Sequence, residues 1–151
     1  MSALPVIHTT SGKHVYRYLR SILLNSRERK VLLSVLHIGL PLAPPWLAKD
    51  DCEKIAARLA AIHQQMKDAG FRYDILHASP DTGLNEFRER LRAERVDAIL
   101  IGGGVAGDPK LAAFKQQIVG AARDVAPQAK VLEFDHALEV PVLVGHAFGM
   151  L

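Results

Sequence analysis

The sequence lacks the features that mark several large classes of protein. It has one cysteine, Cys52, so no intrachain disulfide can form and a reducing compartment is expected. Its longest stretch without a formal charge, Val31–Ala48, contains one glycine and three prolines, which rules out a single membrane-spanning helix there. We therefore expect a cytoplasmic protein with no membrane partner.

The motifs that identify common catalytic and metal sites are also missing. There is no Gly-x-Ser-x-Gly nucleophile elbow and no Gly-x-x-x-x-Gly-Lys-Ser/Thr phosphate loop. The seven histidines include no His-x-His or His-Glu-x-x-His pair that would place two metal ligands on one element. The sequence therefore predicts no metal site, and it does not identify a cofactor.

The charge of the chain is concentrated near the N-terminus. Residues 1–30 contain six Lys or Arg and one Glu, whereas the other residues contain 13 basic and 15 acidic side chains. We expect a single domain over residues 1–151, in which a basic arm and helix (residues 1–29) precedes an α/β core (residues 30–151). Because the arm has no recognisable nucleic-acid motif, we expect it to pack on its own domain or on a neighbouring subunit. This arrangement predicts a homo-oligomer and makes nucleic acid an unlikely partner.

Hydrophobic periodicity predicts that strands and helices alternate along the chain. The predicted strands cover residues 30–38, 71–78, 98–101, 130–134 and 140–144. The predicted helices cover residues 13–24, 50–70 and 109–125, with a further helix between residues 83 and 95. This alternation predicts a three-layer α/β fold with a five-stranded, mainly parallel sheet in the flavodoxin-like order 2-1-3-4-5, preceded by an extra N-terminal helix.

The ends of the long second helix carry recognisable signals. Asp50 and Glu53 have the spacing of a capping box, and Gly70 is suited to the position just beyond the last turn.

The stretch from Val96 to Pro109 combines a buried strand, a glycine loop and a helix start. Asp108 followed by Pro109 predicts an N-cap and the first residue of a helix. Between the strand and this cap lie the four loop glycines, Gly102, Gly103, Gly104 and Gly107. Glycines allow positive φ and a close approach of the backbone to a ligand, and such loops at the carboxyl end of a strand commonly bind ligands. The alternative is a tight strand-to-helix connection with no ligand.

The segment Ile-Leu-Ile-Gly-Gly-Gly-Val-Ala-Gly, residues 99–107, resembles the dinucleotide-binding fingerprint of FAD and NAD proteins. The sequence departs from that fingerprint because its helix begins after the third motif glycine, and because the strand is the third in the sheet. The predicted architecture also resembles phosphoacceptor domains of the response-regulator kind. Those domains carry an acidic pair after the first strand, an aspartate at the end of the third and a lysine at the end of the fifth. The corresponding positions here hold His37, Gly102 and His146, and a phosphoacceptor function is therefore not expected.

Histidines recur where the predicted strands end. His37, His77 and His136 would meet at the carboxyl edge of the sheet beside the glycine loop, and His146 follows the last predicted strand. Histidine is the side chain best suited to acid/base work near neutral pH, so we predict His37, His77 and His136 as catalytic candidates. The predicted ligand-binding residues are Gly102, Gly103, Gly104, Gly107, Trp46 and Asp135.

These observations predict a pocket for a small polar or anionic, nucleotide-like ligand at the carboxyl edge of the sheet. Loop N–H groups would hold the ligand, and Trp46 would form a lid or an aromatic wall. The competing prediction is a non-catalytic assembly or interaction domain, in which the glycines serve only the turn and the arm builds an oligomer.

Overall fold

Strands and helices alternate along the chain in a computed structural model, which describes residues 12–25, 33–43 and 46–151. The strands are β1 (Ser34–Gly39), β2 (Arg72–His77), β3 (Ala98–Ile101) and β4 (Lys130–Glu133). The helices are α1 (Gly12–Asn25), α2 (Lys49–Asp68), α3 (Gly83–Ala93), α4 (Gly103–Ala106), the 3₁₀ turn η1 (Pro109–Leu111), α5 (Ala112–Val125) and α6 (Val140–Ala147).

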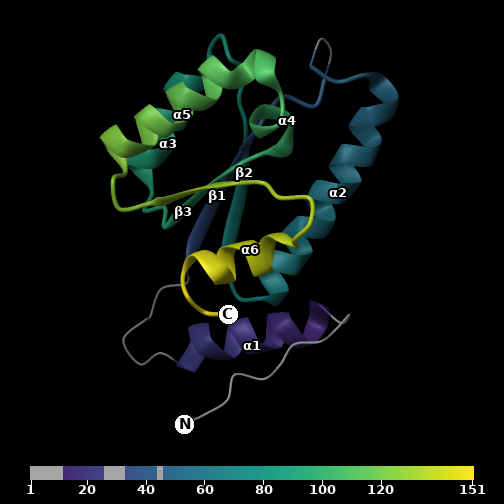
Figure 1. Ribbon diagram of the computed structural model, residues 1–151, viewed down its shortest axis with the longest axis vertical. Coiled ribbons are helices and arrows are strands. Elements are labelled where there is room, and N and C mark those ends of the chain that lie inside the picture. Colours follow the sequence, from purple (N-terminus) through teal and green to yellow (C-terminus); the bar gives the residue numbers. More distant parts are fainter. Residues whose placement is uncertain (1–11, 26–32, 44–45) are drawn as a thin grey trace.

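The four strands form one parallel sheet in the order β2-β1-β3-β4, with helices on both faces (Figure 1). Helices α3 and α5 pack on one face, and α1, α2 and α6 pack on the other. This confirms the α/β class, the helices on both faces of a parallel sheet and the flavodoxin-like order of the first four strands. Strand β2 lies at an edge of the sheet, and its residues alternate between exposed and buried over most of its length.

The predicted fifth strand, residues 140–144, is wrong because this segment is the helix α6. A short apolar run does not by itself distinguish a strand from a buried helix. Pro141 lies in the first turn of α6, where its missing N–H costs nothing. Val140 and Val144, four residues apart, are both fully buried, so α6 covers a face of the sheet instead of extending it. Strand β4 is therefore an edge strand.

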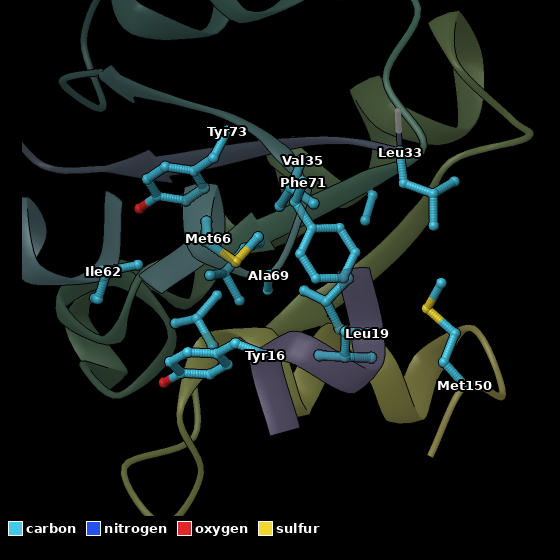
Figure 2. Close-up of a cluster of buried hydrophobic side chains, with 14 of the residues drawn as sticks. Tyr16, Leu19, Leu33, Val35, Ile62, Met66, Ala69, Phe71, Tyr73 and Met150 are labelled. Carbon is cyan, nitrogen blue, oxygen red and sulfur yellow. The ribbon is translucent and has the colours of Figure 1, made fainter. Parts of the chain in front are cut away.

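Two hydrophobic clusters hold the layers together, one on each face of the sheet. Figure 2 shows the cluster that α1 joins, in which Tyr16 and Leu19 lie below Met66 and Phe71. The Tyr16 hydroxyl also donates a hydrogen bond to Glu139, which precedes α6. The described part of the N-terminal arm thus packs on its own chain, whereas residues 1–11 and 26–29 lie outside the described residues.

The ends of α2 only partly follow the prediction. Its N-cap residue is Ala48, which has no side-chain oxygen, so the capping box at Asp50 and Glu53 is wrong. Asp50 instead lies in the first turn, where its charge is favourable towards the helix dipole. Gly70 follows the helix with φ +88°, as predicted for that position. Among the described residues, no helix is long and apolar enough to span a bilayer.

Candidate functional site

A pocket of about 140 Å³ lies at the carboxyl edge of the sheet, on the face that α2 covers. Its polar lining comes from His37, Arg58, His77 and His136. Its apolar walls are Leu40, Leu42, Leu47, Ile55, Leu59, Ile75 and Phe134. The structure thus gathers the three predicted histidines, from β1, the end of β2 and the loop after β4, around one cavity. The parallel strands make this possible because their carboxyl ends meet at one edge.

The other predicted site residues divide into two groups. Gly102, Gly103 and Gly104 line the pocket, whereas Gly107, Trp46 and Asp135 do not. Asp135 is exposed, and its carboxylate accepts a hydrogen bond from the Ala137 N–H within a turn. His146 is exposed on α6 and lies outside the pocket lining.

His37 is the buried imidazole of the site, with 4% of its surface exposed. Its Nδ1 lies 2.6 Å from the hydroxyl oxygen of Tyr73 on β2. Burial, reinforced by the nearby His77, lowers the pKa of His37 from 6.5 to about 4, so the ring is neutral at physiological pH. Burial also raises the pKa of Tyr73, which keeps its hydroxyl protonated.

The bond between His37 and Tyr73 determines which ring nitrogen carries the proton. If the Tyr73 hydroxyl donates to Nδ1, the neutral ring carries its hydrogen on Nε2. In the opposite tautomer, the buried hydroxyl would have no acceptor among the described residues, which is costly. We therefore assign the Nε2–H tautomer to His37. No hydrogen bond is present at Nε2 of His37 among the described residues, and no fully enclosed side-chain nitrogen or oxygen there lacks a partner, so this Nε2 is not fully enclosed. Because His37 lines the pocket, we assign its Nε2–H to the pocket.

His77 is exposed, and its ring carries the hydrogen on the opposite nitrogen from that of His37. Its Nδ1 lies 3.1 Å from the carbonyl oxygen of Leu40. A carbonyl oxygen can only accept, so the Nδ1 of His77 carries the hydrogen. In the neutral ring, Nε2 then holds the lone pair and is the basic atom. The two histidines therefore offer opposite hydrogen-bonding groups to the pocket.

His136 completes the histidine group through aromatic packing. Its ring packs nearly perpendicular to the Phe134 ring, at a centroid distance of 4.9 Å and an interplanar angle of 80°. Phe134 in turn lies nearly parallel to the His37 ring, at 6.4 Å. Phe134 thus contacts both imidazoles and forms the apolar wall that they share.

The glycine loop differs from the prediction in its backbone. Gly103–Ala106 forms the short helix α4, and none of the loop glycines has a positive φ. The loop therefore does not use the positive φ that its glycines allow. The backbone at Gly102 lies close to other parts of the chain, because a Cβ on Gly102 would lie 3.0 Å from His37 Nε2 and 3.1 Å from the Ile38 carbonyl oxygen. Glycine at position 102 makes room for the buried imidazole.

Most N–H groups of the loop are already used within the protein. Those of Gly102, Val105, Ala106 and Gly107 donate to backbone carbonyl groups, which leaves at most those of Gly103 and Gly104 for a ligand. The Asp108 carboxylate caps the following turn through the backbone N–H of Lys110, as its sequence position predicts. The loop can thus offer fewer N–H groups to a ligand than its four glycines suggest.

Arg58 is a pocket residue that the sequence analysis missed. It lies on α2 three residues after Ile55 and one before Leu59, both of which line the same cavity. The helical repeat of α2 places residues 55, 58, 59 and 62 on one face, and this spacing could have identified Arg58. Its guanidinium forms no ion pair with any of the described residues. Arg58 therefore brings to the pocket a positive charge that no described acidic side chain pairs with.

The described part of the chain contains no group of three or more His, Cys, Asp or Glu residues that could hold a metal ion. The chemistry of the pocket therefore rests on imidazole, guanidinium and apolar groups. Comparisons of the chain with protein-family models, with curated proteins and with solved structures found no match.

Proposed function

We propose that the protein binds a small organic anion in this pocket, with the acidic group near Arg58 and an apolar body against the leucine and isoleucine walls. The observation that carries the proposal is a guanidinium that pairs with no described carboxylate and lies beside three imidazoles, in a pocket whose described lining has no Asp or Glu. Such a lining attracts a carboxylate or phosphate and repels a cation.

The size of the cavity supports a ligand with one ring or a short chain. A volume of about 140 Å³ is close to that of an engineered apolar cavity of roughly 150 Å³ that binds benzene. A dinucleotide is several times larger than this space. Because Arg58, His77 and His136 are exposed, the acidic end of a ligand would lie at the mouth of the pocket and its apolar end inside.

A non-catalytic assembly role, with a homo-oligomer built through the arm, is the alternative proposal. Val15, Tyr16 and Leu19 of α1 are buried in the core of their own chain, so this part of the arm offers little apolar surface to a partner. Light scattering of the full chain and of a chain without residues 1–11 tests this alternative, because an oligomer built through residues 1–11 must dissociate when they are removed.

The binding experiment is a calorimetric titration with benzoate, phenyl phosphate and phenylpyruvate, with benzyl alcohol as the uncharged control. We expect the acids to bind more tightly than the alcohol. Arg58→Gln should weaken the acids about fivefold, since an exposed ion pair contributes little, and Arg58→Glu should weaken them about tenfold or more. Benzyl alcohol should bind both variants as it binds the wild type.

Arg123→Gln is the matched control, because Arg123 is an exposed arginine on α5, outside the pocket lining, and also forms no ion pair with a described residue. The proposal is wrong if none of the three acids binds, or if Arg58→Glu and Arg123→Gln have the same effect on their affinity.

A further inference from the structure

The pocket holds two imidazoles whose hydrogen atoms are placed by different partners. The Tyr73 hydroxyl leaves His37 with an Nε2–H donor, and the Leu40 carbonyl oxygen leaves His77 with a basic Nε2. Both side chains lie on the same face of the sheet, because His37 pairs with Ile75 and His77 follows two residues later on β2. A ligand in the pocket thus meets a donor on β1 and a base on β2.

The remaining lining excludes several other kinds of chemistry. The described residues that line the pocket include no Ser, Thr, Cys, Lys, Asp or Glu, so none of the usual side chains for covalent catalysis is present except histidine. A neutral imidazole that donates a hydrogen bond suits an oxygen on which negative charge develops. A second imidazole with a free lone pair suits the removal of a proton.

We infer that this site catalyses proton transfer at the carbon next to the carbonyl group of a small 2-oxo acid, with His77 as the base and His37 as the hydrogen-bond donor to the carbonyl oxygen. This inference rests on the proposed binding of a small organic anion. Arg58 would hold the carboxylate, and the apolar wall would hold the rest of the substrate.

The step is balanced without a further reactant. His77 Nε2 takes the proton from carbon 3, the C–H electron pair forms a C=C bond, and the carbonyl π pair moves onto oxygen. The Nε2–H of His37 donates a hydrogen bond to that oxygen. The proton then returns from His77 to the oxygen or to carbon 3, so the net reaction is the interconversion of the keto and enol forms. Because His77 is exposed, its proton exchanges with solvent between the two transfers.

This exchange supplies the assay. Pyruvate, 2-oxobutyrate or phenylpyruvate is incubated with the protein in D₂O, and the loss of the carbon 3 proton signal is followed by NMR. We expect His77→Asn to slow the protein-dependent exchange by about a hundredfold to ten-thousandfold, because asparagine preserves the donor to Leu40 and removes the base. His37→Asn should slow it by about a hundredfold to a thousandfold. The His146→Asn variant, changed at an exposed position of α6 outside the pocket lining, should catalyse exchange at the wild-type rate.

Binding is measured on the same variants with benzoylformate, a 2-oxo acid without a hydrogen on the neighbouring carbon. Two outcomes would overturn this inference if benzoylformate binds: exchange that is unchanged in the His77→Asn variant, or wild-type exchange no faster than in buffer. Either outcome would leave the proposed binding function standing. If neither benzoylformate nor the three substrates bind, the proposed function fails and this inference fails with it.

Tyr73 is a positioning residue in this scheme, since it touches His37 and not the substrate. Nitrogen NMR of ¹⁵N-histidine-labelled protein should find the hydrogen on Nε2 of His37 and on Nδ1 of His77 in the wild type. Tyr73→Phe should remove the preference of His37 for a hydrogen on Nε2, and it should leave the hydrogen of His77 on Nδ1. A hydrogen on Nδ1 of His37 in the wild type would refute the assignment of roles.

Discussion

Acid should destabilise this protein through His37 in a defined pH range. Burial lowers the pKa of His37 from 6.5 to about 4 in the folded state, whereas the unfolded chain keeps the ordinary value. Between these values the unfolded state binds the proton more readily, so the free energy of unfolding falls as the pH falls. The stabilisation from the neutral ring is fully present above about pH 6.5 and is lost as the pH decreases towards 4.

The size of this effect follows from the difference between the two pKa values. A shift from 6.5 to about 4 corresponds to a loss of about 2 kcal/mol between pH 7 and pH 5, and of about 3 kcal/mol by pH 4. Typical domains have a total unfolding free energy of about 5–15 kcal/mol, so a loss of this size is readily measured. The residue is almost fully buried, and solvent screening therefore reduces the effect little.

The assay is urea unfolding followed by circular dichroism, at several pH values between 4 and 7.5, for the wild type and for His37→Gln. Other groups titrate in both proteins, so the difference between the two curves isolates His37. We expect the stability advantage of the wild type to shrink by about 3 kcal/mol across this range. A difference that does not change with pH would refute the argument, as would an NMR titration that places the His37 midpoint near 6.5.

Three further predictions concern the fold. Leu19→Ala should lower the unfolding free energy by about 2–5 kcal/mol, because Leu19 is fully buried beneath the sheet, and a loss below about 1 kcal/mol would contradict the packing of α1. Gly83→Ala should lower the unfolding free energy by about 1–3 kcal/mol in the same urea assay, because the new Cβ would lie 2.4 Å from the Cβ of Ala78. In contrast, Gly120→Ala should stabilise α5 by about 0.5–1 kcal/mol, because its new Cβ would have no atom within 4 Å. Asp108→Ala should cost about 1 kcal/mol through the lost cap, and thermal unfolding that matches the wild type would refute that role.

The sequence by itself determined the alternation of strands and helices and the edge of the sheet at which the pocket lies. Four of the five predicted strands are present, because their short length and the turn residues beside them favour a strand over a helix. His77 ends β2, and His37 lies two residues before the end of the neighbouring strand β1. Because the two strands are parallel, their carboxyl ends lie at the same edge of the sheet. Their meeting could therefore be inferred without coordinates.

The tertiary structure decided the features that depend on contacts between distant parts of the chain. The run at residues 140–144 is a helix because its burial against α1 and α2 outweighs a pattern that fits either structure. The tautomer of His37 depends on Tyr73, 36 residues away, and the pairing of β1 with β2 sets that contact. Arg58 reaches the pocket because of how α2 lies across the sheet. Sequence periodicity determines which face of an element is buried, whereas packing determines what that face meets.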